Sequence, residues 1–345
     1  MTIETAFIMD TSQIKFGFGA THEVGHDMQA LGSKRVMVLT DPNLSDSEPV
    51  SVTLTALDHV GVDAVLFDQV RVEPTDVSFK QAIDFAVDGN FDGYVAVGGG
   101  SCMDTAKAAN LYATYPADFL TYVNQPIGKG EPAPGQLQPS IAIPTTAGTG
   151  SETTGVAIFD LLEMRAKTGI AHRALRPSMG IVDPNNTRTL PKIVSACCGL
   201  DVLSHALESL TALSFDKRLA PKSPKYRPTY QGANPISNLW ASRAIEMVSK
   251  NLVRAVEDPS DDEARGQMLL ASTFAGIGFG NAGVHLPHGM SYPVAGMVRD
   301  FIPEGFPSPH PIVPHGMSVI LNAPAVFRFT VSTNPELHLY AAELM

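Results

Sequence analysis

The sequence predicts an α/β domain with a parallel sheet, followed by an all-α domain. In the first half of the 345 residues, short β-branched runs alternate with amphipathic stretches. Such alternation is typical of βαβ units. After residue 184 the apolar residues instead follow long helical periods. We therefore expect an α/β domain over residues 1–184 and a helical domain over residues 185–345.

The predicted strands of the first domain are continuous apolar runs, as expected for parallel strands that are buried on both faces. They cover residues 34–40, 62–67, 93–98, 140–144 and 179–184. Helical patterns lie between them and cover residues 21–31, 47–60, 76–88 and 101–114.

The second domain contains longer helical patterns. They cover residues 191–213, 235–258, 261–277 and 317–329. Pro235 lies in the first turn of its predicted helix, where proline is tolerated. The segment 214–234 is basic and rich in proline, and we interpret it as an excursion loop.

Composition excludes several classes of function. The chain carries a net charge of −11 and has no long basic run, so we expect no nucleic-acid partner. Its three cysteines form no CxxC pair and predict no disulfide framework, which suits a reducing compartment. We also expect no secretory signal and no membrane span. These features together predict a cytoplasmic protein.

A glycine-rich turn follows the third predicted strand. Residues 98–100 are all glycine, and Ser101 then begins a helix that also carries Asp104. Glycine lets the backbone approach a ligand, and a helix N-terminus offers N–H groups to phosphate. We interpret the turn as a phosphate-binding loop. The Ser-x-x-Asp spacing also predicts that Asp104 caps the helix.

A second glycine motif, Gly278, Gly280 and Gly283, has the G-x-G-x-x-G spacing. It follows a helical pattern and lies outside any βαβ unit, so it does not predict a dinucleotide site. Close packing between helices explains these glycines better.

Two further features follow predicted strands. The run 144–152 combines hydroxyl side chains with glycines, a composition that suits phosphate and ribose oxygens, although a plain Thr/Gly loop is an alternative. Asp41 ends the first predicted strand, where a carboxylate can accept hydrogen bonds from ribose hydroxyls. Before a proline, such an aspartate is also a common turn former.

One carboxylate and three imidazoles form a candidate metal site in the second half. Asp201 and His205 have i, i+4 spacing, which places both side chains on one face of a helix. His288 and His315 each stand in a Pro-His-Gly context. This donor set suits a divalent first-row metal. A rival set includes Cys197, four residues before Asp201, whose thiolate would favour zinc.

Five motifs in order then identify a resemblance that spans essentially the whole chain. They are GGGSCMD (98–104), PTTAGTGSE (144–152), GLDVLSHALE (199–208), HGM (288–290) and PHG (314–316). Together they resemble the iron-dependent alcohol dehydrogenase family, whose fold is similar to that of dehydroquinate synthase. Residues 230–241, 274–296 and 310–321 resemble its hydroxyacid–oxoacid transhydrogenase branch.

The resemblance implies a role for each matching residue. The implied metal ligands are Asp201, His205, His288 and His315, with Fe²⁺ expected and Zn²⁺ as an alternative. Asp41 implies ribose binding and a preference for NAD over NADP, because it would repel a 2′-phosphate. The other implied cofactor-binding residues are Gly99, Gly100, Ser101, Asp104, Thr145, Thr146, Thr149 and Lys167.

The chain departs from the family pattern in two ways. Many members have a proton-relaying histidine four residues after the third ligand, where this chain has Tyr292. A tyrosine is a weaker base but can still donate or relay a proton, so Tyr292 is the candidate catalytic residue. The family also continues with further helices after the fourth ligand, so we expect the helical domain to be incomplete.

The implied function is metal-dependent hydride transfer through NAD between a hydroxyacid such as 4-hydroxybutyrate and an oxoacid such as 2-oxoglutarate. His285, Arg299 and Arg173 are candidate partners for the substrate carboxylate. The alternatives are a simple NAD-dependent alcohol dehydrogenase with exchanging cofactor and an inactive, truncated nucleotide-binding protein. A metallohydrolase is disfavoured by the two nucleotide loops. The family also suggests a homodimer.

Overall fold

The computed structural model describes residues 2–345, and these form two compact units. The α/β unit comprises Ser12–Thr146 and Ser151–Thr187. The helical unit comprises the segment that ends at Thr11, Ala147–Gly150 and Arg188–Met345. The prediction divided the chain at residue 184, and the structure divides it after Thr187. The two short segments were assigned to the α/β domain from the sequence, whereas the structure groups them with the helices.

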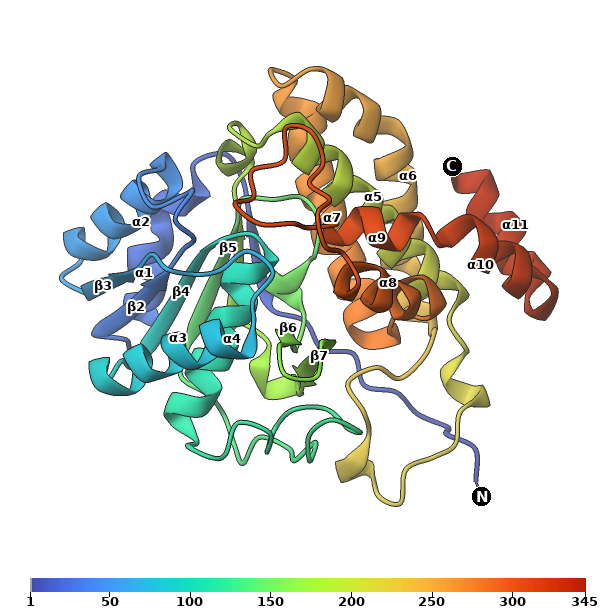
Figure 1. Ribbon diagram of the computed structural model, residues 1–345, viewed down its shortest axis with the longest axis horizontal. Coiled ribbons are helices and arrows are strands. Elements are labelled where there is room, and N and C mark those ends of the chain that lie inside the picture. Colours follow the sequence, from blue (N-terminus) through green and yellow to red (C-terminus); the bar gives the residue numbers. More distant parts are fainter. Residues whose placement is uncertain (1) are drawn as a thin grey trace. The chain divides into compact units, whose positions relative to one another are not determined.

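Six parallel strands form the sheet of the α/β unit, in the order β1-β8-β5-β4-β2-β3 (Figure 1). Their bounds are β1 Gln13–Phe16, β2 Arg35–Leu39, β3 Asp63–Phe67, β4 Gly93–Gly98, β5 Ser140–Pro144 and β8 Met179–Val182. The five predicted strands are confirmed. The first strand was not predicted, because its short segment lacks a continuous apolar run.

Helices cover both faces of this sheet. On β2, Val36 and Val38 pack in the cluster that includes side chains of α1 and α2, while Met37 and Leu39 pack with side chains of α3 and α4. Alternate residues of one strand thus serve two cores, which explains its continuous apolar sequence. The four helices are α1 Val24–Ala30, α2 Glu48–His59, α3 Asp76–Gly89 and α4 Gly100–Thr114.

The strand order reverses between β2 and β4. From β2 the chain moves outward to β3, then returns across β2 to form β4 on its other side. In open α/β sheets, ligands bind at the carboxyl ends of the strands that flank such a reversal. The residues that follow β2 and β4 are Asp41 and the glycine turn, so the topology places both predicted cofactor elements at this point.

A two-stranded antiparallel hairpin, β6 Val156–Leu161 and β7 Ala166–Ala171, adds to the α/β unit. Its Phe159 packs against Phe79 of α3 and against Phe119. The sequence analysis did not predict this hairpin. Its turn contains neither glycine nor proline, and Arg165 takes the left-handed conformation there with φ 50°.

The helical unit is built around α5, which packs against α6, α7 and α9, while α8 packs against α9. The bounds are α5 Lys192–Thr211, α6 Pro235–Glu257, α7 Asp262–Ala282, α8 Leu286–Gly296, α9 His315–Ile320, α10 Ala323–Thr330 and α11 Pro335–Leu344. The predicted helix 317–329 is wrong as one element. It divides into α9 and α10, because Pro324 begins a new helix near its first turn.

Helix α7 continues through the glycines that the sequence analysis set aside. Gly278 lies against α6, and a Cβ atom there would meet the Ser237 carbonyl oxygen at 3.3 Å. Gly283 ends the helix with φ 99°. Gly278 and Gly283 therefore serve helix packing and helix termination, and the motif follows a helix rather than a strand.

Side-chain amides attach the N-terminal segment to the helical unit. Asn281 of α7 accepts a hydrogen bond from the Asp10 N–H at 3.0 Å and donates one to the Asp10 carbonyl at 2.8 Å. Gln231 pairs with both backbone groups of Ile8 in the same way. This double pairing explains why a segment far away in sequence belongs to this unit.

Helix α5 has the length and apolar composition of a membrane-spanning helix, and most of its apolar window is buried inside the protein. Core helices of globular proteins share these properties. Among the described residues, no other helix has both.

We expect Gly25→Ala to destabilise the α/β unit. A Cβ atom at this position of α1 would lie 1.9 Å from the Ala56 carbonyl oxygen of α2, so the two helices would have to separate. Overpacking of this kind typically destabilises by about 1–3 kcal/mol. Urea denaturation followed by circular dichroism measures the change. The control is Ser51→Ala on the exposed surface of α2, expected to change stability by less than about 0.5 kcal/mol. Equal midpoints for the two variants would contradict the prediction.

Candidate metal centre and cofactor-binding loops

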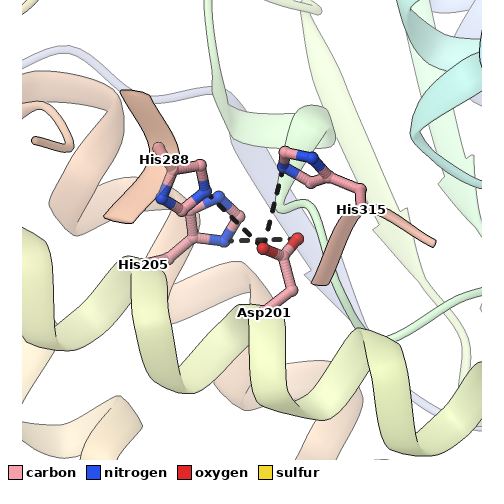
Figure 2. A group of neighbouring side chains, drawn as sticks. All are labelled: Asp201, His205, His288 and His315. Atoms are coloured by element: carbon pink, nitrogen blue, oxygen red, sulfur yellow. Dashed lines mark ion pairs between the residues drawn. The ribbon is translucent and has the colours of Figure 1, made fainter. Parts of the chain in front are cut away.

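Four side chains converge within the helical unit. Asp201 and His205 project from adjacent turns of α5, His288 from α8 and His315 from the first residue of α9 (Figure 2). One ligand atom from each lies within 4.8 Å of the others. The structure therefore brings together all four predicted metal ligands.

The Asp201 carboxylate is at the centre of this group. Its oxygens lie 3.8 Å from His205 Nδ1, 3.6 Å from His288 Nε2 and 3.8 Å from His315 Nε2 (Figure 2). Ligand–metal distances of about 2.0–2.2 Å in a tetrahedral site separate the ligand atoms by about 3.4 Å. The observed spacing is close to that value and is too long for direct hydrogen bonds.

Three of these ligand atoms are buried without a hydrogen-bond partner among the described residues. They are Asp201 Oδ1, His205 Nδ1 and His288 Nε2. A buried polar atom without a partner costs free energy, so native proteins rarely leave one, let alone three that face one point. A cation bound between them would satisfy all three, and the residues present therefore fit a divalent metal.

The protonation of Asp201 and His205 also suits a cation. Burial would raise the pKa of Asp201, but the imidazoles of His205, His315 and His288 outweigh it and lower this pKa below its ordinary value. Burial lowers the pKa of His205 to about 4 against the opposing charge of Asp201. A charged carboxylate and a neutral imidazole are the forms that bind metals.

His288 carries a second contact that the sequence analysis missed. Its Nδ1 lies 2.5 Å from Oε1 of Glu208, a fully buried residue of α5. Burial acts to lower the pKa of His288, but Glu208 and Asp201 raise it to about 10. Glu208 follows Asp201 and His205 on the same helix face, at i+7 and i+3, and this spacing was the signal that could have found it.

Packing holds the remaining imidazoles in place. The His205 ring stacks on Phe279 with centroids 4.0 Å apart and on His288 with centroids 4.5 Å apart. Gly316 lets α9 approach α5, because a Cβ atom there would meet the Cys197 carbonyl oxygen at 2.0 Å. The Pro-His-Gly motif at His315 thus has a steric reason, whereas Gly289 has open space around it.

The rival set with Cys197 does not form among the described residues. The converging group contains the four ligands above and omits this cysteine. Burial, with the charge of Asp201, raises the pKa of the Cys197 thiol to about 11. A high pKa disfavours the thiolate, which is the form that binds metals.

In the α/β unit, the glycine turn joins β4 to α4. Gly98 has φ 154°, and a Cβ atom there would lie 2.4 Å from Cys102 Sγ. Helix α4 begins at Gly100, so the N–H groups of Gly100 and Ser101 lie in its first turn. This is the geometry of an anion-binding helix N-terminus at a sheet edge.

The threonine run lies beside this turn. The Thr145 N–H donates to the Gly98 carbonyl at 3.0 Å, and Thr146 lies against Gly99. Thr149 belongs to the segment 147–150 of the helical unit, where Gly150 lies against α7. The structure therefore places Thr145 and Thr146, but not Thr149, in one unit with the glycine turn.

The predicted capping role of Asp104 is wrong. Helix α4 has Gly99 at its N-cap, with no side-chain hydrogen bond. The Asp104 carboxylate instead accepts hydrogen bonds from Ser151 Oγ at 2.6 Å and from the Ile158 N–H at 2.9 Å. It also faces the buried Lys107 at 3.5 Å. Asp104 thus connects α4 to the hairpin.

Asp41 lies at the end of β2, beside the glycine turn. Its Oδ1 accepts hydrogen bonds at 2.9 Å from the backbone and the side chain of Asn43, and Cys102 Sγ lies 3.8 Å from its Oδ2. Its turn-forming role is therefore confirmed, and ribose binding stays a prediction.

Lys167 on β7 has carboxylate partners of its own. Its Nζ lies 2.5 Å from Glu73 and 3.2 Å from Asp160. Burial would lower the pKa of this lysine, but the two carboxylates raise it above its ordinary value. The ammonium is therefore charged and held within the α/β unit, and its contact with a cofactor stays a prediction.

The other candidates from the sequence also stay predictions. Tyr292 lies on α8 one turn after His288 and is partly exposed. His285 precedes α8, with its Nε2 3.0 Å from Thr211 Oγ1. Arg299 is exposed and donates to backbone carbonyls near the end of α8, and Arg173 belongs to the α/β unit.

Comparison with protein families decides the classification. Residues 11–184 match the model described as iron-containing alcohol dehydrogenase, and residues 229–345 match the C-terminal model of the same family. The chain belongs to the iron-containing alcohol dehydrogenase family. It is therefore an oxidoreductase.

Curated relatives extend over the whole chain. The mitochondrial hydroxyacid-oxoacid transhydrogenase of Rattus norvegicus is 56% identical over 346 aligned residues, which cover 100% of this chain and 74% of the relative. The Homo sapiens protein of the same name is 54% identical with the same coverage. These matches support the branch that the sequence motifs resemble.

Solved structures share the fold. A 1,3-propanediol oxidoreductase matches with a TM-score of 0.84 and 29% identity, covering 99% of this chain and 80% of that one. Sulfoacetaldehyde reductase from Bifidobacterium kashiwanohense, in complex with NAD⁺, matches with a TM-score of 0.78 and 25% identity over 99% and 85% of the two chains. The predicted fold class is confirmed.

The comparison overturns one expectation. The relatives from rat, mouse, cattle and human are all named as mitochondrial proteins. The prediction of a cytoplasmic location is therefore wrong. It rested on cysteine usage, which indicates the redox state of a compartment, and on the expected lack of a secretory signal and of a membrane span. None of these distinguishes the cytosol from the mitochondrial matrix. The homodimer stays a prediction.

We expect a divalent metal to stabilise the helical unit through Asp201. At a free metal concentration one hundred times the Kd, binding adds about 2.7 kcal/mol. This corresponds to a rise in Tm of roughly 5–10 °C for a unit of this size. Calorimetry with and without Co²⁺ measures the rise, and Asp201→Asn should abolish it. Asp262→Asn, which removes an exposed partner of Arg188 in the same unit, is the control and should keep it. A full rise in Asp201→Asn would remove this residue from the metal site.

Proposed function

We propose that this enzyme transfers hydride between a hydroxyacid and an oxoacid through NAD, at a divalent metal held by Asp201, His205, His288 and His315. The observation that carries the proposal is the convergence of three buried, unpartnered ligand atoms on one point. The similarity to hydroxyacid-oxoacid transhydrogenases supports the substrate class. We propose 4-hydroxybutyrate as the donor and 2-oxoglutarate as the acceptor.

Fe²⁺ is the metal we propose, since the family is named for it and three imidazoles with one carboxylate suit a divalent first-row ion. Zn²⁺ accepts the same donors and is the alternative. The metal supplies Lewis acidity, which lowers the pKa of an alcohol and polarises a carbonyl. The chain's part is to hold that charge at a fixed place, with Asp201 ionised and the imidazoles oriented by packing.

NAD is the proposed hydride carrier, and the α/β unit supplies its site. Gly99, Gly100 and Ser101 would hold the pyrophosphate at the N-terminus of α4. Thr145 and Thr146, which lie beside this turn, would offer their side-chain hydroxyls to the cofactor. The Asp41 carboxylate would accept hydrogen bonds from the ribose hydroxyls and repel the 2′-phosphate of NADP.

The reaction is redox-neutral for the enzyme. Oxidation of the hydroxyacid removes a hydride from its carbinol carbon and a proton from its hydroxyl, and reduction of the oxoacid takes up one of each. We propose that Tyr292 Oη carries the proton. Its position one turn after His288 supports this proposal, because residues at i and i+4 share a helix face.

Label transfer tests the proposed reaction. The protein is loaded with Fe²⁺ and one equivalent of NAD⁺ without oxygen, freed of unbound cofactor, and given carbinol-deuterated 4-hydroxybutyrate with 2-oxoglutarate. We expect deuterium in 2-hydroxyglutarate, detected by mass spectrometry, because the bound cofactor carries the hydride between the two acids. His288→Ala should lower this transfer at least a hundredfold.

The other outcomes each reject part of the proposal. NADH formation only when free NAD⁺ is supplied would indicate a simple dehydrogenase with exchanging cofactor. NAD binding without either reaction would indicate a nucleotide-binding protein without this activity. Unchanged transfer in His288→Ala would reject the ligand assignment.

Cofactor preference tests Asp41. The Asp41→Asn variant keeps an oxygen that can accept from the Asn43 N–H but loses the negative charge. We expect kcat/KM for NADP⁺ to rise about fivefold relative to NAD⁺, since one close charge repulsion contributes on the order of 1 kcal/mol in a solvated site. Steady-state kinetics with both cofactors measure the ratio. Asp46→Asn, in the same unit, is the control, and an equal ratio in both variants would contradict the role of Asp41.

A further inference from the structure

We infer that Glu208 is a positioning residue for the metal centre, which holds His288 in the tautomer whose Nε2 faces the metal. This inference rests on the proposed metal site. Glu208 is not one of the four proposed ligands. Its role is to orient one of them, His288.

From its place on α5, Glu208 reaches His288 of α8 and the backbone of His285, which directly precedes this helix. Its Oε1 lies 2.5 Å from His288 Nδ1, and its Oε2 accepts a hydrogen bond from the His285 N–H at 2.6 Å. The side chain is completely buried. One carboxylate thus fixes the beginning of α8 and the ring of its metal ligand at the same time.

These contacts decide which imidazole nitrogen carries the proton. An ionised carboxylate offers only acceptors, so Nδ1 of His288 must donate to it. In a neutral imidazole the other nitrogen, Nε2, then keeps its lone pair. Nε2 is the atom that faces Asp201 at 3.6 Å and has no hydrogen-bond partner among the described residues. When a metal displaces a proton from this ring, the carboxylate therefore keeps the remaining proton on Nδ1, so that Nε2 is the atom that binds.

A glutamine could not perform this task. Both partners of Glu208 require an acceptor, and an amide has one acceptor group and one donor group. If its oxygen accepts from the His285 N–H, its NH₂ faces His288 Nδ1. That nitrogen must then accept, and the ring proton moves to Nε2, where it blocks the metal. A glutamine of nearly the same size would thus impair metal binding through the tautomer of His288.

The test measures metal affinity rather than activity. Metal-free wild-type and Glu208→Gln proteins are titrated with Co²⁺ against a competing chelator, with the visible absorption of bound Co²⁺ as the signal. We expect Glu208→Gln to bind Co²⁺ about 10–100-fold more weakly, the usual effect of losing such a partner. Glu257→Gln, which removes an exposed carboxylate of α6, is the matched control and should bind like the wild type.

A merely structural role would give a different result. It would lower the Tm of the metal-free variant and leave the Co²⁺ affinity and spectrum of the folded protein unchanged, which would overturn the inference. Should Glu208→Gln fail to fold, Glu208→Asp, whose shorter side chain cannot keep both contacts, is titrated instead, and wild-type affinity there would also overturn it. A wild-type protein that binds no Co²⁺ would reject the metal site itself, and the inference with it.

Discussion

The negative charge of Asp201 is buried in the helical unit, where only 2% of the residue is exposed. Removing a carboxylate from water costs several kcal/mol unless positive charge and hydrogen bonds replace the water. Three imidazoles surround this carboxylate, and no hydrogen bond to them replaces the water on its Oδ1. A divalent cation would supply the missing charge and the missing bonds together. The arrangement of α5, α8 and α9 follows from the need to bring donors to this one point.

The convergence of these donors also constrains the backbone of α8 and of α9. Helix α9 contacts α5 so closely that only a glycine fits at Gly316, directly after the ligand His315. Directly before α8 begins, the N–H of His285 donates a hydrogen bond to Glu208 of α5. Each neighbouring helix is thus fixed to α5 next to the ligand that it supplies. Small displacements of these helices would separate the ligands, so packing and metal binding depend on the same contacts.

The sequence predicted the convergence of the four proposed ligands better than it predicted their surroundings. The i, i+4 spacing of Asp201 and His205 defines a helix face by itself, and the motif context identified His288 and His315. Glu208 lies on that same face, but its partners are His285 and His288. No local sequence pattern predicts that this distant segment packs against α5. The hairpin β6–β7 was missed for a related reason, since its turn lacks glycine and proline and depends on Arg165 in a left-handed conformation. Asp104 satisfied a local capping pattern, yet contacts distant in sequence, to Ser151 and Ile158, decided its place.

The proposed NAD site and the candidate metal centre differ in how they are encoded. The proposed pyrophosphate-binding part relies on backbone groups at a sheet edge, and a strand, a glycine turn and a helix that follow one another in sequence suffice to form it. The metal centre relies on side chains from three helices, and its geometry exists only after those helices pack. A substitution in the glycine turn therefore acts locally on the backbone. In the helical unit, by contrast, a residue that never touches the metal can control it, because the hydrogen bond of Glu208 decides which nitrogen of His288 is free to bind.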